Sequence, residues 1–179
     1  TNSITEKTIE IECPANKRIF ATVPRGNEAD VDIAVKSSLK AFRSWSKVMP
    51  KERGKILLQI ADAIEIEKED IAKIIATETG NAIKTQARPE INLVVDIFRY
   101  FGGLSSELKG ETIPLGEHVL SYTRREPLGV VGAIIPWNAP VMLGACKIAP
   151  ALCAGNTIVM KAAEDAPLAI LKVAEICQK

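Results

Sequence analysis

The sequence predicts an α/β protein in which a helical layer precedes the start of a parallel, Rossmann-like cofactor-binding sheet. Three observations support this prediction: helical periodicity between residues 28 and 103, short strand-like segments after Gly103, and the order strand, helix, strand, helix from Gly129 onward. Apolar strands joined by a crossover helix are typical of parallel sheets covered on both faces. Two strands and two helices are too few to bury such strands, so we expect further elements from a missing part of the domain or from another chain.

The changes of pattern divide the chain into three parts. Residues 1–110 are expected to form an amino-terminal arm, with a small hairpin between Thr8 and Val23, and the helical layer. Residues 111–126 have turn residues around short alternating segments, which predicts a β-arm. Residues 127–179 are expected to form the first βαβα part of a dinucleotide-binding domain.

The helical layer is predicted as four helices. Asn27 is a good N-cap for the first, and a proline at position 50 suits the first turn of the second. The third is expected to end at Gly80, and the fourth to begin near Pro89 and stop at Gly102-Gly103. The side chains expected to point inward are Val31, Ala34, Val35, Leu39, Phe42, Trp45, Ile56, Leu57, Ile60, Ala63, Ile64, Ile91, Val94, Val95, Phe98 and Phe101.

The composition argues against several classes of function. The 23 basic and 22 acidic residues nearly cancel without forming long blocks, so neither a nucleic-acid partner nor an anionic membrane is expected. The sequence offers few ligands for a metal site. It has one histidine, His118, which is expected on an exposed strand, and four cysteines that form no C-x-x-C pair. The cysteines are expected to be reduced thiols, which favours a cytoplasmic location, and Cys146 and Cys153 are expected to be small core side chains. No apolar segment has the length of a membrane span.

Polar residues follow both strands of the predicted parallel sheet. Such sheets bind ligands at the carboxyl ends of their strands, which selects Pro136-Trp137-Asn138 and the segment from Lys161 to Glu164. The residues alone leave alternatives open: Asn138 can cap the next helix or donate to an oxyanion. Lys161 and Glu164 can be a solvated lysine and a helix-start carboxylate. The sequence contains no G-x-G-x-x-G turn, so the residues alone do not indicate a dinucleotide-binding site.

Longer motifs carry a resemblance to a known family. The segment "EPLGVVGAIIPWNAPVMLGACKIAPALCAGNTIVMKAAEDAPLAILKVAEI" resembles the opening of the cofactor domain of the aldehyde dehydrogenase superfamily. The segments "AFRSWSKVMPKERGKILLQIADAIE" and "ETGNAIKTQA" extend the resemblance over nearly the whole chain. It implies oxidation of an aldehyde to the carboxylic acid with NAD or NADP, through a cysteine thiohemiacetal and thioester. It also implies that the arm at residues 111–126 serves oligomerisation, in a homodimer or homotetramer.

The resemblance also implies roles for single residues. Asn138 matches the asparagine that stabilises the oxyanion, and Lys161 with Glu164 matches the pair that holds the adenine ribose. A carboxylate at Glu164 accepts from ribose hydroxyls and repels a 2′-phosphate, so NAD is expected rather than NADP. The other positions expected to contact the cofactor are Ile135, Pro136, Trp137 and Ala163.

Two departures from the family pattern lead to further expectations. None of the four cysteines stands in the nucleophile's motif, so the nucleophile is expected beyond this chain, which alone is expected to be inactive. Where many relatives carry aromatic residues, this sequence has Ala139, with Leu143 and Cys146 on the same helical face. These small side chains predict a substrate tunnel for a bulky or aromatic aldehyde, with core packing as the alternative. A non-catalytic structural or binding fragment of the same fold is the alternative function.

Overall fold

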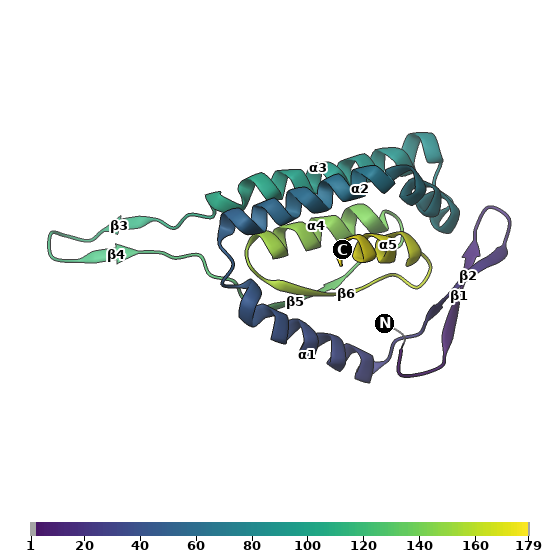
Figure 1. The fold of residues 1–179 in the computed structure, drawn as a ribbon, viewed down its shortest axis with the longest axis horizontal. Coiled ribbons are helices and arrows are strands. Elements are labelled where there is room, and N and C mark those ends of the chain that lie inside the picture. Colours follow the sequence, from purple (N-terminus) through teal and green to yellow (C-terminus); the bar gives the residue numbers. More distant parts are fainter. Residues whose placement is uncertain (1–2, 179) are drawn as a thin grey trace.

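The computed structural model describes residues 3–178, and its elements stack in layers (Figure 1). The pair α2 and α3 packs on α4 and α5, the parallel strands β5 and β6 lie beneath α4, and α1 covers the far side of these strands. The helices are α1 (Glu28–Trp45), α2 (Pro50–Thr79), α3 (Arg88–Leu104), α4 (Pro140–Cys153) and α5 (Leu168–Ile176). The strands are β1 (Thr8–Cys13), β2 (Arg18–Pro24), β3 (Thr112–Pro114), β4 (Leu120–Tyr122), β5 (Val130–Ile134) and β6 (Thr157–Lys161). The predicted helical layer followed by a parallel sheet is confirmed.

Two antiparallel hairpins, β1–β2 and β3–β4, accompany this body. The first has a register shift between Ile11 and Glu12, and the second extends away from the helices as a long arm (Figure 1). The antiparallel pairing expected of both segments is confirmed. His118 is exposed as predicted, but it lies in the turn between β3 and β4, so its placement on a strand is wrong.

Residues 50–79 form one continuous helix, so the prediction of two helices in this segment is wrong. The polar run that suggested a new helix start is the solvent side of α2. There Lys68 pairs with Glu65 at 3.4 Å and Lys73 pairs with Asp70 at 2.9 Å, each three residues apart. The predicted end is confirmed, because Gly80 has φ 75°, a left-handed conformation that glycine adopts readily.

The fourth predicted helix begins where expected, near Pro89, but ends later than predicted. It is α3, which follows a π-helical turn at Ile83–Ala87 and continues past Gly102 to Leu104. Gly102 is buried against Leu58 and Gly54 of α2, so the glycine serves close helix packing and does not stop the helix. The core lies between α2, α3, α4 and α5, with Phe98 fully buried at its centre.

The sheet and α1 are less buried than the apolar pattern suggests. Ile134 at the end of β5 is 80% exposed, as expected for two strands with too little cover. In α1 the predicted inward face is wrong for Val31, Val35 and Leu39, which are exposed. A two-stranded sheet is too narrow to cover the whole apolar face of a helix. Ile56 of α2, also expected inward, is exposed as well.

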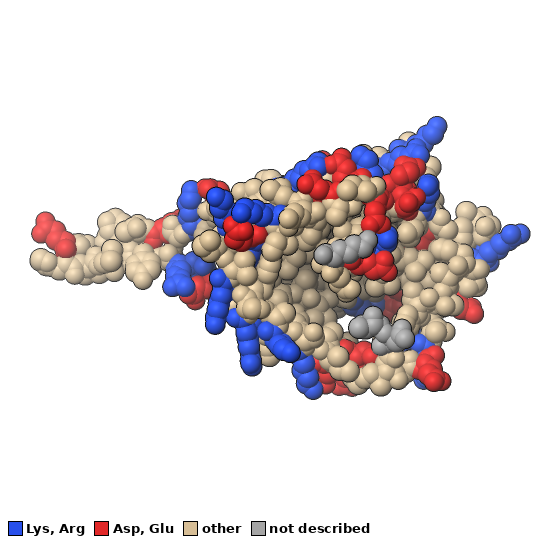
Figure 2. All heavy atoms as spheres, viewed as in Figure 1, with Lys and Arg blue, Asp and Glu red and all other residues tan. Residues whose placement is uncertain are grey.

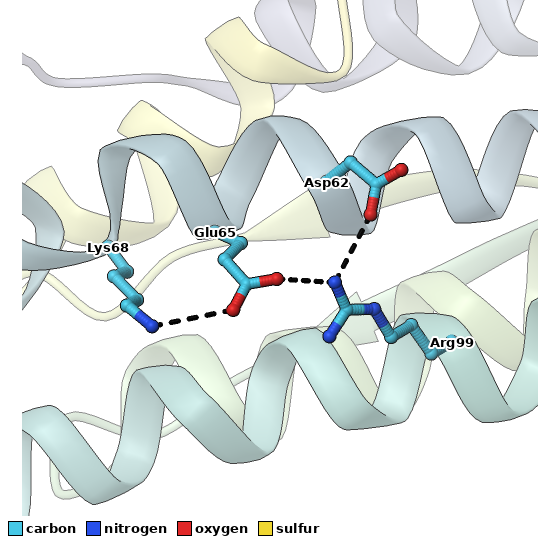
Figure 3. Close-up of polar contacts among 4 residues, drawn as sticks. All are labelled: Asp62, Glu65, Lys68 and Arg99. Atoms are coloured by element: carbon cyan, nitrogen blue, oxygen red, sulfur yellow. Dashed lines mark hydrogen bonds and ion pairs between the residues drawn. The ribbon is translucent and has the colours of Figure 1, made fainter.

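Charged side chains lie mainly on the outer faces of the helices. Figure 3 shows Arg99 of α3 reaching two carboxylates of α2, with Asp62 at 3.2 Å and Glu65 beside it, while Lys68 pairs with the same glutamate. Because all four side chains are well exposed, this network adds little to stability. Figure 2 shows both charge signs mixed over α2 and α3, with basic side chains along α1.

Of the helices in the described part of the chain, none combines the length and the apolar character that a membrane span requires. Within residues 3–178, no group of three or more histidine, cysteine, aspartate or glutamate side chains is placed to hold a metal ion.

Candidate functional site

The carboxyl ends of β5 and β6 lie side by side and place two loops next to each other. In the parallel register Ile134 lies opposite Lys161, and the amide of Ile135 donates to the carbonyl of Lys161 at 3.2 Å. We call residues 135–139 the first loop and residues 161–167 the second loop. The structure therefore brings together the two segments that the sequence analysis selected.

The first loop has a buried root and exposed polar residues. Ile135 is buried, whereas Pro136, Trp137 and Asn138 are exposed. The backbone carbonyl of Asn138 accepts from Nδ2 of Asn81 at 3.2 Å. Within residues 3–178 the side-chain amide of Asn138 makes no hydrogen bond, and the N-cap residue of α4 is Ala139. The alternative that Asn138 caps this helix is therefore wrong, and its amide is free to meet a ligand.

The start of α4 is capped from another helix. Oε1 of Glu90 in α3 accepts from the amides of Val141 and Met142, at 3.0 and 3.1 Å. Glu90 is buried, and this burial raises the pKa of its carboxyl, while the two amides lower it. The carboxylate also meets the positive end of the helix dipole. Glu90 thereby fixes the helix that follows Asn138.

The second loop begins with an exposed ion pair. Nζ of Lys161 lies 2.9 Å from Oε1 of Glu164, and each side chain is 54% exposed. The hydrogen bond from Lys161 lowers the pKa of Glu164, so this group is a carboxylate at neutral pH. Ala163 is buried between them and anchors the loop. A cation and a carboxylate that solvent can reach are suited to a ligand with several hydroxyl groups.

The start of α5 is capped in a similar way by Glu78 of α2. Its Oε2 accepts from the amide of Leu168 at 2.6 Å, and its Oε1 accepts from the amide of Ala169 at 3.0 Å. The residue is only 3% exposed, and burial raises the pKa of its carboxyl to about 7. The two amides oppose this rise, and the nearby Glu90 adds to it.

A cavity of about 340 Å³ lies beside Glu78. It is lined by Glu10, Glu12, Pro14, Glu78, Thr79, Trp137, Asp165 and Ala166. The lining comes from β1 and the turn after it, the end of α2, and both loops. The cavity therefore lies where these segments meet.

The segment A-L-C-A-G-N before β6, residues 151–156 within the family-like stretch, has a structural explanation. Gly155, with φ 86°, follows the end of α4. Oδ1 of the buried Asn156 then accepts from the amide of Gly129 at 3.0 Å, and the amide of Thr157 donates to the carbonyl of Gly129 at 3.0 Å. These bonds set the register in which β5 and β6 run, and hence the pairing of their carboxyl ends.

The three residues proposed for a substrate tunnel follow one another along the start of α4. The amide of Leu143 donates to the carbonyl of Ala139 at 3.0 Å, and both residues are half-buried. Cys146 is exposed and Cys153 is buried, so the expected core position is confirmed for Cys153 and wrong for Cys146. In the described residues, the face of α4 that carries Cys146 is thus open to solvent at this position.

Sequence reasoning missed the polar residues that support the two loops: Glu78, Asn81, Glu90 and Asn156. One signal was present in the sequence. Both α4 and α5 begin without a side-chain cap of their own, at Ala139 and Pro167. Their orphan amides require acceptors from elsewhere in the fold.

Comparisons with known proteins agree with this architecture. The model of the aldehyde dehydrogenase family matches residues 1–179. Aldehyde dehydrogenase 1 of Tanacetum cinerariifolium is 43% identical over 93% of this chain and 34% of its own length. The long-chain-aldehyde dehydrogenase of an Acinetobacter species is 39% identical over 92% of this chain and 33% of its own length.

Solved structures extend the comparison. PnpE from Pseudomonas sp. WBC-3 superposes with a TM-score of 0.95 at 37% identity, over 99% of this chain and 37% of that one. A structure of PnpE in complex with nicotinamide adenine dinucleotide gives a TM-score of 0.96 at 37% identity, over the same shares of the two chains. A variant of the aldehyde dehydrogenase from Bacillus cereus also gives 0.96 at 37% identity, again over 99% of this chain and 37% of that one.

The fold and the matched family model define the class of protein: the chain belongs to the aldehyde dehydrogenase family. It spans about a third of the length of the curated relatives that it matches, 34% for the relative from Tanacetum cinerariifolium. The resemblance seen in its motifs is thus confirmed, and the chain corresponds to the amino-terminal portion of that fold.

Proposed function

We propose that a protein carrying this chain oxidises an aldehyde to the carboxylic acid with a nicotinamide cofactor, NAD rather than NADP. Family membership and the relatives' names support aldehyde oxidation, and the NAD complex of PnpE supports the cofactor class. One observation carries the proposal. An unbonded Asn138 amide and an exposed Lys161–Glu164 pair stand on neighbouring strand ends, where sheets of this kind bind ligands.

The second loop fits the adenosine end of such a cofactor. Glu164 is charged and exposed, so it can accept from two neighbouring ribose hydroxyls, while Lys161 can donate to them. A 2′-phosphate would bring like charge against the carboxylate, which favours NAD. Ile135, Pro136, Trp137 and Ala163 would line the same cleft. When bound, the cofactor supplies the hydride acceptor of the oxidation.

Asn138 would act at the reacting carbonyl. Its amide donates a hydrogen bond without titrating, so it can stabilise the negative oxygen that forms when a thiolate attacks the aldehyde carbon. The nucleophilic cysteine is proposed to come from a segment outside this chain, since none of the four cysteines present lies on either loop. We further propose a homo-oligomer, dimer or tetramer, assembled through the β3–β4 arm. A cytoplasmic location is proposed because one similar protein carries the name cytosolic aldehyde dehydrogenase 1.

Replacing Glu164 by glutamine tests the cofactor assignment. We expect NAD to bind about tenfold more weakly, because a charge-assisted hydrogen bond is lost, and NADP to lose much less. Titration calorimetry with both cofactors measures the two affinities. Glu117→Gln, a change on the exposed turn of the arm, is the matched control and should bind as the original chain does. The proposal fails if neither the original chain nor a family-length protein containing it binds a nicotinamide cofactor.

Replacing Ala139 by phenylalanine tests the proposed substrate tunnel. In a protein of family length, the added ring should depress turnover of a bulky aromatic aldehyde roughly tenfold more than that of acetaldehyde. Steady-state rates with the two aldehydes give the ratio. Equal losses for both substrates would show that Ala139 packs against protein and does not line the tunnel.

A further inference from the structure

The carboxyl end of α2 and the turn after it contact the start of α5 and the first loop of the candidate site. Glu78 lies in the last turn of the helix and accepts from the first amides of α5, directly after the second loop. Asn81 follows the Gly80 turn and donates from Nδ2 to the carbonyl of Asn138 in the first loop. The hydroxyl of Thr79 accepts from the amide of Asn81 at 3.1 Å, which holds this residue in place.

The two capping glutamates differ in how they use their oxygens. Glu90 binds both of its amides through Oε1 alone, so a proton on Oε2 leaves these two bonds intact. Glu78 binds one amide through each oxygen, so a proton on either oxygen turns a charged acceptor into a hydroxyl and weakens one of the two bonds. Glu78 therefore holds α5 fully only as a carboxylate.

We propose that Glu78 and Asn81 are positioning residues that hold the two loops at the spacing which cofactor and aldehyde require. This inference rests on the proposed function, because it assigns the supporting contacts of the same site. Glu78 acts through the start of α5 and hence through Lys161 and Glu164. Asn81 acts through the backbone of Asn138.

The surroundings of Glu78 make this support depend on pH. The acidic groups around it are Glu90 of α3, whose charge acts on Glu78, and Glu10, Glu12 and Asp165, which line the same cavity. Burial, with a smaller contribution from the charge of Glu90, raises the pKa of Glu78 to about 7. Acidification through neutral pH should therefore weaken one of the two hydrogen bonds that hold the start of α5, and loosen the second loop that precedes it.

Protonation of Glu78 is expected to loosen the second loop but to increase the stability of the folded protein. Because the pKa of Glu78 rises on folding from 4.5 to about 7, the folded state binds the proton more tightly. The stability that this group contributes is complete below the unfolded pKa and is lost as pH rises through about 7. Glu78→Gln should therefore gain melting temperature relative to the original chain as pH rises.

The test compares Glu78→Gln with Asp70→Asn, an exposed carboxylate on the same helix. NAD affinity of the original protein should rise about fivefold between about pH 6 and pH 8. Glu78→Gln should stay flat at the weak level, because a side-chain NH₂ cannot accept from an amide, and Asp70→Asn should follow the original protein. At about pH 8, hydrogen exchange should be faster at Leu168 or Ala169 in Glu78→Gln, because one of these two amides loses its acceptor, and unchanged at both in Asp70→Asn.

The outcomes separate this inference from the proposed function. If the original protein binds NAD and Glu78→Gln keeps both its affinity and its pH profile, the positioning role is wrong. If no NAD binds at any pH, the proposed function fails, and the positioning of α5 is still judged from amide exchange. In a family-length protein, Asn81→Ala should lower kcat while leaving the KM for NAD unchanged, and an unchanged kcat would overturn its role.

Discussion

Replacing Asn138 by alanine should lower aldehyde turnover by on the order of 10²–10³ in a protein of family length. Within the described residues, the side-chain amide of Asn138 makes no hydrogen bond. Its backbone carbonyl accepts a hydrogen bond from the side chain of Asn81. Removal of the amide should therefore cost little stability. The loss should appear in kcat, because the amide meets a negative oxygen that exists only during the reaction.

Two comparisons sharpen this prediction. Asn138→Asp keeps the shape but places a negative charge against the oxyanion, so its turnover should be at least as low as that of Asn138→Ala. Asn92→Ala, an exposed change on α3, should retain full turnover. Stopped-flow measurement of NADH formation would report each rate. A less than tenfold loss in Asn138→Ala would remove this residue from the chemistry.

Replacing Gly54 by alanine should destabilise the protein by about 3 kcal/mol, because the backbones of α2 and α3 approach each other closely at this point. A Cβ at Gly54 would lie 2.5 Å from the carbonyl oxygen of Gly102 and 3.3 Å from Cβ of Ser105. The first contact is with backbone, which a rotamer change cannot relieve. The helices would have to separate, and the buried contacts around Phe98 would loosen.

Gly103→Ala is the matched control for this prediction. Gly103 lies in α3 next to Gly102, but a Cβ there meets nothing within 4 Å. Its replacement by alanine should be neutral or stabilising by up to about 1 kcal/mol, because alanine favours the helix. Chemical denaturation of both variants measures the difference. Equal stabilities would show that the helices are not in contact at Gly54.

Helix ends that depend on neighbouring residues were predicted correctly from the sequence. Asn27 caps α1 through a reciprocal pair of bonds, with Oδ1 accepting from the amide of Asp30 at 3.0 Å and the carboxylate of Asp30 accepting in return at 2.9 Å. Gly80 ends α2 in the left-handed conformation. Such features need only neighbouring residues, so local sequence suffices to predict them.

The family motifs were similarly informative about the strand ends. They placed Asn138, Lys161 and Glu164 on two loops, and the register of β5 and β6 brings these loops together. The roles of the three residues remain predictions, and so does the tunnel of Ala139, Leu143 and Cys146. The prediction of two helices in place of α2 was wrong, because a polar run on the solvent face of a helix resembles the start of a new helix.

Only the tertiary structure decided what holds the loops. The caps of α4 and α5 come from Glu90 and Glu78, which lie 51 and 91 positions away from Val141 and Ala169. Local sequence therefore predicted that a helix follows each of the two parallel strands, but not which acceptors meet the free amides of these helices. A buried amide must be satisfied by some acceptor, and which one reaches it depends on how distant segments pack.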